Sequence, residues 1–456
     1  MRRISLSRSI GLLCLLVAFQ SSAGGRWGPP AQYADPHQTA RQYNAAATDQ
    51  PRQIALLLPA TGKHADSATA IREGFFTTYY ESAGQNGVKP TVRVYDSTKE
   101  KDIEYLYEIA VREGADFVVG PLSKEEVIRL ARMSPSKART PILALNYDPS
   151  VRPIPNFVQF SLAPESEAEQ IAEKAFHQGH RTASIIVPDN VWGKRIATAF
   201  TARWNALGGR VLQSVQASTK HDQSGAVKKL LGIDQSQQRA NQLKDILTEK
   251  VDFQPRRRQD VDMIVMAATP DLARQLKPLF DFYYAEKVPV YATSSIYNGS
   301  PNAKRDRDIN GVIFCDMPWL LDPERGSEVK RLLGRSEKEH SDQYNRLFAM
   351  GVDAYHLTQR LRIMDGQRVT YPGATGTMLL DPNNVIRRKL AWAKIVNGVP
   401  VLLQTGADKS LVQPREVPAA PSEAAKNAEE GDLDNVPEVS QEAVPTTNEE
   451  PVGSQT

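Results

Sequence analysis

The stretch Phe117-Val118-Val119-Gly120-Pro121-Leu122-Ser123 combines a short apolar strand, a tight turn and the start of a helix. Ser123 and Glu126 have the spacing of a capping box, which predicts a helix that continues to about Met133. The same strand–loop–helix order recurs on both sides of this stretch. Short apolar strands that alternate with amphipathic helices are typical of βα units around a parallel sheet.

Two sets of these units follow one another along the chain. The first set has strands at 54–58, 92–95, 117–119 and 141–145, with helices at 102–113 and around Ile71, Phe75 and Tyr79. After a connection at 157–161, the second set has helices from 165, 193 and 271, and strands at 184–187, 211, 263–266 and 289–292. Two similar sets predict two lobes.

The remaining segments predict how the lobes are joined. A strand at 311–314 leaves the second lobe, helices at 337–348 and 353–364 return to the first, and runs at 377–380, 390–395 and 399–403 look like a closing β meander. The polar stretch 216–259 is predicted to be a helical and loop insertion on the second lobe. We therefore predict an α/β, two-lobed fold in which each lobe is a parallel sheet flanked by helices, with a three-strand hinge. Lobe 1 is expected at about 52–158 and 312–366, and lobe 2 at about 159–311 and 367–405.

The N-terminal region is typical of an exported protein. Arg2, Arg3 and Arg8 precede the apolar run 10–19, and Ser21-Ser22-Ala23 follows it, which predicts a cleaved signal peptide at 1–23 and a periplasmic location. The run has about half of the roughly 20 residues that a membrane-spanning helix needs, so no transmembrane span is predicted. Cys14 follows two leucines rather than a small residue, so it fits a lipidation signal poorly. The alternative to an unanchored periplasmic protein is a lipid anchor in the outer membrane.

Two further segments lie outside the predicted lobes. Residues 24–51 are polar and are predicted to be a linker. Residues 406–456 are rich in Pro, Ala and Glu, and from Gln413 onward ten acidic residues stand against two basic ones. Such a composition buries too little apolar surface to offset the entropy of ordering, so this tail is predicted to be disordered.

Catalytic and metal-binding motifs are missing from the sequence. Two Ser-x-x-Lys matches, at 134–137 and 327–330, lack the Ser-Asp-Asn and Lys-Thr-Gly motifs that would complete a penicillin-binding site. His177 and His180 could share a helix face, but positive side chains near the end of a helix explain them more simply than a metal site does. We therefore predict no catalytic residue, no metal site, no cofactor and no nucleic-acid partner. A cell-wall hydrolase or transferase is disfavoured for the same reason.

Candidate ligand-binding residues come from the loops that follow the strands, because open α/β sheets bind ligands at the carboxyl ends of their strands. These candidates are Thr61, Ser123, Asn146 and Tyr147 in the first lobe, and Asp189, Trp192, Ser294 and Tyr297 in the second.

The order of elements resembles type I periplasmic-binding-protein modules over about 53–404, with Gly120–Ser123 after the third strand and Gly373–Thr377 before the closing strands. Within that superfamily the chain resembles the C-terminal domain of the penicillin-binding protein activator (LpoA-like) family. The stretches that carry this resemblance are Leu143–Asn146, Phe160–Glu165 with Glu167-Ala168, Asp260–Asp262 with Ala268–Pro270, Tyr291–Ser295 and Ala349–Tyr355.

The resemblance implies a non-enzymatic regulator of peptidoglycan synthesis. Members of the family are outer-membrane lipoproteins that activate a class A penicillin-binding protein by protein–protein contact. The alternative function is a periplasmic solute-binding receptor for a small amino-acid-like ligand, because the fold alone does not specify a function.

Overall fold

The computed structural model describes residues 50–82, 89–99, 102–133, 137–218, 223–246, 253–322, 342–366 and 369–403. These residues all fall within one unit of the chain, 49–456. The predicted signal peptide with Cys14, nearly all of the predicted linker, both Ser-x-x-Lys matches apart from Lys137, and the predicted acidic tail lie outside the described residues. Among the described residues, no helix is both long and apolar enough to span a bilayer.

Within this part of the chain, the first lobe is built on a five-stranded parallel sheet with the order β2-β1-β3-β4-β5. Its strand β1 is buried because five of its six residues are apolar. The strands are β1 (Gln53–Leu58), β2 (Thr91–Asp96), β3 (Phe117–Val119), β4 (Ile142–Ala144) and β5 (Phe157–Gln159). The helices that follow them are α2 (Ala65–Ser82), α3 (Ile103–Arg112) and α4 (Lys124–Ala131).

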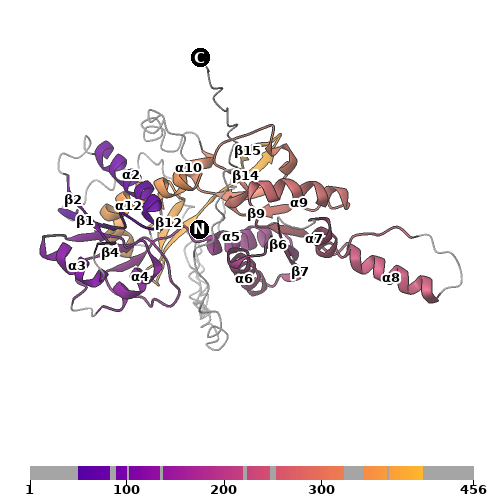
Figure 1. Ribbon diagram of the computed structural model, residues 1–456, viewed down its shortest axis with the longest axis horizontal. Coiled ribbons are helices and arrows are strands. Elements are labelled where there is room, and N and C mark those ends of the chain that lie inside the picture. Colours follow the sequence, from indigo (N-terminus) through magenta and orange to yellow (C-terminus); the bar gives the residue numbers. More distant parts are fainter. Residues whose placement is uncertain are drawn as a thin grey trace, which may run out of the picture. The chain divides into compact units, whose positions relative to one another are not determined.

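The second lobe is built on a sheet with the order β15-β14-β10-β9-β8-β6-β7. Its strands are β6 (Thr182–Pro188), β7 (Arg210–Ala217), β8 (Met263–Met266), β9 (Val290–Ala292), β10 (Ile313–Asp316), β14 (Ala391–Val396) and β15 (Val399–Leu402). Its helical segments are α5 (Pro164–His177), α6 (Val191–Ala206), α7 (Gln223–Leu230), α8 (Ile233–Ile246), α9 (Pro270–Phe282), η1 (Ser294–Ile296) and η2 (Asp306–Ile309). The predicted insertion at 216–259 thus contains α7 and α8 (Figure 1).

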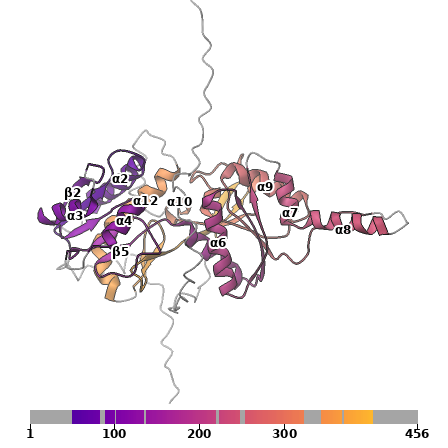
Figure 2. The same ribbon diagram turned by 60° about the horizontal axis from the view of Figure 1, so that its bottom comes forward.

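The segment between the lobes differs from the prediction in one respect. Two helices were expected at 337–348 and 353–364, of which 337–341 lies outside the described residues. The described residues of this segment form the short α10 (Pro318–Leu321) and the long α12 (Asp342–Gly366), which runs through both predicted helices. Gly351 does not interrupt α12, because it lies where the helix packs closely against α2. Figures 1 and 2 both show α12 beside α2.

The closing strands are not a single meander. β11 (Tyr371–Pro372), β12 (Thr377–Leu380) and β13 (Ile386–Lys389) form a small antiparallel sheet, and Met378 and Ile386 bury their side chains in the core of the first lobe. Only β14 and β15 join the second sheet, where β14 pairs with β10. The predicted lobe bounds therefore shift: β10 belongs to the second lobe, and residues 371–389 pack with the first.

The prediction also missed the fifth strand of the first sheet, since 157–161 was interpreted as a connection. Phe157 and Val158 are buried, and β5 pairs in parallel with β4. Within the described residues the chain passes between the two lobes three times, after β5, after β10 and between β13 and β14. The last crossover is short, since one residue separates these two strands.

Candidate functional site

Two first-lobe candidates, Thr61 and Ser123, make contacts with nearby loop and helix residues. Thr61 is exposed, and its hydroxyl lies 2.9 Å from the hydroxyl of Thr98. Ser123 is the N-cap of α4, where its hydroxyl accepts a hydrogen bond of 3.3 Å from the backbone N–H of Glu126. The predicted capping contact is therefore present, and it accounts for Ser123 without a ligand.

The other two first-lobe candidates connect neighbouring loops. The side-chain amide of Asn146 donates to the backbone oxygen of Leu122 at 2.9 Å, and its side-chain oxygen accepts from the backbone N–H of Tyr147 at 2.8 Å. Burial raises the pKa of Tyr147, while the nearby charge of Arg387 opposes this rise. Asn146 thus holds the loop after β4 against the loop after β3.

The second-lobe candidates separate into two groups. Asp189 is exposed and Trp192 is half-buried, with the Trp192 ring packed against the core under α5 and α6. Ser294 and Tyr297 are buried in and after η1, where the Tyr297 ring lies 5.7 Å from that of Phe314. The structure places only these last two in a common polar network.

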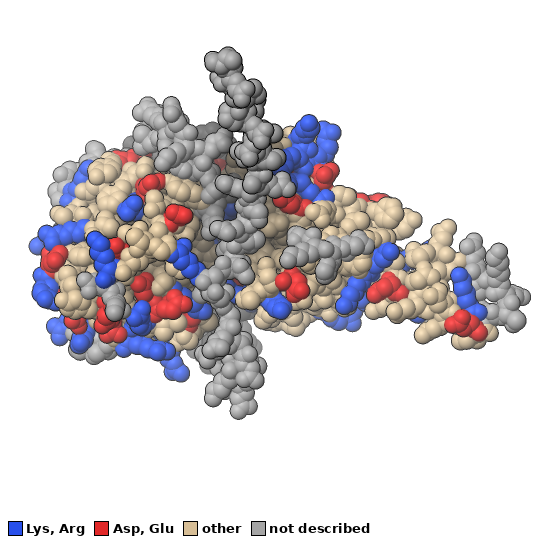
Figure 3. All heavy atoms as spheres, in the orientation of Figure 1, with Lys and Arg blue, Asp and Glu red and all other residues tan. Residues whose placement is uncertain are grey.

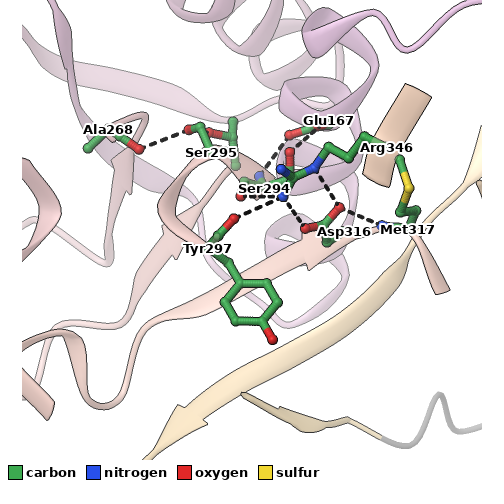
Figure 4. A network of polar contacts seen from close by, with 9 residues as sticks. Glu167, Ala268, Ser294, Ser295, Tyr297, Asp316, Met317 and Arg346 are labelled. Carbon is green, nitrogen blue, oxygen red and sulfur yellow. Dashed lines mark hydrogen bonds and ion pairs between the residues drawn. The ribbon is translucent and has the colours of Figure 1, made fainter. Parts of the chain in front are cut away.

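That network is centred on a carboxylate and an arginine that the sequence analysis did not single out as site residues (Figure 4). Glu167 of α5 accepts hydrogen bonds from the backbone N–H of Ser294 at 2.8 Å and from its hydroxyl at 2.9 Å. Arg346 of α12 donates to Asp316 at 2.6 Å, and to the backbone oxygens of Tyr297 at 3.0 Å and Ser294 at 3.3 Å. The side chain of Asp316 is 2% exposed and that of Arg346 is 19% exposed, so the ion pair is largely shielded from water.

A second buried cluster lies on the same helix, two turns further on. The carboxylate of Asp353 accepts from the backbone N–H groups of Ala374 and Thr375, both at 2.7 Å, and from the Thr375 hydroxyl at 2.6 Å. Arg388 of β13 is buried and donates to the backbone oxygen of Thr375 at 3.2 Å. The loop 373–377, which carries part of the resemblance to type I periplasmic-binding-protein modules, is thus held by the carboxylate of Asp353 on α12.

Burial dominates the electrostatics of both clusters. It raises the pKa of Glu167 to about 7, and the neighbouring Asp316 adds to the rise, while the Ser294 bonds and Arg346 oppose it. Burial likewise raises the pKa of Asp353 to about 6 against the three hydrogen bonds that favour its charged form. Both carboxylates are therefore less stable as anions in the fold than in water.

The Glu167 shift predicts a dependence of stability on pH. Because the pKa is higher in the folded state, the folded state binds more protons between about pH 4.5 and 7, and stability falls as the pH rises through this window. The loss is at most about 3 kcal/mol. Glu167→Gln keeps the shape of the side chain, and its amide can accept from the backbone N–H of Ser294 and donate to its hydroxyl. Because glutamine does not titrate, the loss of stability caused by Glu167 is expected to disappear in this variant. Urea unfolding of both proteins at pH 5 and pH 8 measures it; an equal pH dependence in the two would contradict the assignment.

The arrangement has no evident catalytic chemistry in the described part of the chain. Both carboxylates are occupied by internal hydrogen bonds, and burial raises the pKa of the Cys315 thiol well above its usual value, which disfavours the reactive thiolate. Among these residues, no group of three or more His, Cys, Asp or Glu could hold a metal ion. His177 lies in the last turn of α5, as expected, and His180 faces Tyr291.

The face of the first lobe that Figure 3 shows adds little to suggest a charged ligand. On the face shown in Figure 3, basic and acidic side chains are interspersed over the first lobe rather than gathered into a stripe of one sign. A stripe of basic side chains is what a protein that tracks a phosphate backbone usually presents.

The missed residues gave only weak signals in the sequence. In the sequence, Glu165, Glu167 and Glu169 crowd the predicted start of a helix, where acidic side chains are favoured by the positive end of the helix dipole. The structure places Glu167 in that first turn and also buries its carboxylate against Ser294, a contact that the helix position alone does not predict. Its place in the family stretch Glu167-Ala168 was the one signal that could have singled it out.

Comparisons with known proteins agree with this fold. A protein of Vibrio antiquarius called penicillin-binding protein activator LpoA is 30% identical over 353 residues, which is 75% of this chain and 57% of that protein. The chain thus spans little more than half the length of this relative.

Two solved structures show the same fold. The LpoA (YraM) C-domain from Haemophilus influenzae, described as a regulator of PBP1A, superposes with a TM-score of 0.59 at 23% identity and covers 77% of this chain and all of that one. An ABC transporter substrate-binding protein from Sphaerobacter thermophilus superposes with a TM-score of 0.51 at 15% identity, over 77% of this chain and 96% of that one. The predicted two-lobed, type I periplasmic-binding-protein-like fold is confirmed.

A family model described as "LppC putative lipoprotein" matches residues 29–398. This match covers the first lobe, the second lobe through β14, and all the elements that carry the two buried clusters. Because the match extends over most of the two-lobed module, the chain belongs to the LppC family.

Proposed function

We propose that this protein is a non-enzymatic regulator of peptidoglycan synthesis that activates a class A penicillin-binding protein by direct contact. The observation that supports this most strongly is the 30% identity to a penicillin-binding protein activator over three quarters of the chain. The occupied carboxylates and the buried Cys315 agree with a role in binding rather than catalysis.

A reconstituted cross-linking reaction tests the proposal. The chain from Gly24 onward is added to each class A penicillin-binding protein of the same cell with lipid-linked peptidoglycan precursor, and the fraction of cross-linked peptides is measured. The expected result is co-purification with one of the enzymes and a higher cross-linked fraction. A penicillin-blocked enzyme, in which cross-linking cannot rise, is the control. The absence of both binding and stimulation for every enzyme would overturn the proposal.

The second candidate function is binding of an amino-acid-like solute, which is supported by the fold shared with a substrate-binding protein. Here the ligand would contact the two exposed residues among the eight candidates, Thr61 and Asp189. A thermal-shift screen of amino acids and short peptides tests it, because a ligand at about 100 times its dissociation constant stabilises the folded state by roughly 2.7 kcal/mol. A screen without any shift would exclude the solutes tested.

We further propose that the chain is delivered to the periplasm by a cleaved signal peptide at 1–23. Membership of a lipoprotein family supports an exported protein and makes an outer-membrane anchor relevant. Mass spectrometry of the mature N-terminus distinguishes a protein released by cleavage of the signal peptide from one anchored by a lipid. An unmodified N-terminus near Gly24 is expected for a soluble module, and a lipid mass on Cys14 would show anchoring instead.

A further inference from the structure

The helix α12 belongs to the first lobe but carries a side chain that binds the second. Its apolar residues Met350, Leu357 and Leu361 are part of the first-lobe core, and α12 packs along α2. Arg346, near its N-terminal end, instead contacts Asp316 at the end of β10 and two backbone oxygens in and after η1. All three acceptors lie in the second lobe.

Glu167 holds the turn that supplies the two carbonyl acceptors. Its two oxygens bind the backbone N–H and the hydroxyl of Ser294, and the Ser295 hydroxyl donates to the backbone oxygen of Ala268 at 2.9 Å. As Figure 4 shows, Ser294 therefore lies between Glu167 and Arg346. The turn is fixed from the α5 side, so its carbonyl oxygens point toward the arginine.

From this geometry we propose that Arg346 is a latch that holds the two lobes in one orientation. A guanidinium that is bound to a carboxylate and two carbonyls has fixed directions for its N–H groups, and shielding from water strengthens each contact. A rotation of one lobe against the other would break several of these bonds together. It would also leave Asp316, which is almost fully buried, without its arginine.

A second contact, at the short crossover between β13 and β14, also restricts movement of one lobe against the other. Gln170 of α5 donates to the backbone oxygen of Arg388 at 3.1 Å and accepts from the backbone N–H of Leu390 at 2.9 Å. These two residues flank the point where the chain passes from β13 to β14. The hinge closure that accompanies solute binding in two-lobed proteins requires such crossovers to change their backbone angles. A latched module instead presents one constant surface to a protein partner.

A distance measurement between spin labels tests the latch. Arg112→Cys in the first lobe and Lys194→Cys in the second provide exposed labelling sites, while the native Cys315 is buried and needs no replacement. The double variant Arg346→Gln/Asp316→Asn removes the latch. Both charges are removed together so that neither is left buried without its partner. In the full mature chain, this variant is expected to show a broader distance distribution with a second maximum, whereas the parent shows one narrow maximum.

The matched control is another shielded ion pair that lies within the second lobe. Arg274 of α9 and Asp306 of η2 are 3.1 Å apart, with side chains 13% and 8% exposed. Arg274→Gln/Asp306→Asn is expected to keep the narrow distribution. A narrow parent-like distribution in the latch variant would overturn the proposal. If the latch variant does not fold, Arg346→Lys, which keeps the charge but loses the planar fork, takes its place, and the same two outcomes apply.

Discussion

Replacing Asp353 by alanine is expected to lower the free energy of unfolding by about 3 to 5 kcal/mol. The carboxylate is fully buried and accepts three hydrogen bonds, two of them from the backbone of the loop 373–377. Its removal leaves these donors without a partner and takes away one of the carboxylates whose negative charge lies near the buried Arg388. The loop that leads into β12 would keep only the apolar packing of Ala374 against α12.

Urea unfolding followed by circular dichroism measures the effect, and Asp116→Ala is a matched control. Asp116 also accepts two backbone hydrogen bonds, from Arg52 at 2.8 Å and Gln53 at 3.0 Å, but it is half-buried. Its loss is expected to cost about 1 kcal/mol, because water can satisfy the released groups. Equal losses at the two positions would show that burial of the carboxylate is not what makes Asp353 important.

Replacing Gly351 by alanine is expected to cost about 3 kcal/mol, at the upper end of what overpacking usually costs. A Cβ atom at this position would lie 2.0 Å from the backbone oxygen of Ile71 in α2. The contact is reciprocal, since a Cβ atom at Gly74 would lie 2.0 Å from the backbone oxygen of Phe348. Backbone atoms cannot rotate away as a side chain does, so α2 and α12 would have to separate along their shared core.

A glycine in a different helix separates this steric effect from helix propensity. Gly225 lies within α7, and a Cβ atom at this position would meet no neighbouring group within 4 Å. Gly225→Ala is therefore expected to stabilise the protein by up to about 1 kcal/mol, since alanine favours helices. Thermal unfolding of both variants compares them. A neutral or stabilising effect of Gly351→Ala would mean that the two helices do not pack as closely as described.

Much of the fold could be predicted from local patterns. The strand at 117–119 and the cap at Ser123 were predicted correctly, because apolar runs and capping residues act over a few neighbouring positions. The long helix α12 was predicted as two, since a glycine inside a helical pattern looks like a break until the packing that needs it is known. The three-residue strand β5 was missed because so short a run has no clear period.

The candidate site was predictable only in part. Ser294 and Tyr297 were found because they follow a strand end, where open α/β sheets place their polar groups. Glu167, Asp316 and Arg346 were not found, since each has an ordinary local explanation in a helix turn, at a strand end or on a helix surface.

By itself, therefore, the sequence determined the two sets of βα units, their order and the family of the module, because these depend on residues that are near one another in the chain. Only the tertiary structure decided which lobe each closing strand joins and which charges meet. Glu167 and Ser294 are 127 positions apart, and Arg346 and Ser294 are 52 apart. The energy of such a contact depends on burial and distance. For Glu167 and Ser294 both are set when the second lobe folds, and for Arg346 they are set only when the two lobes meet.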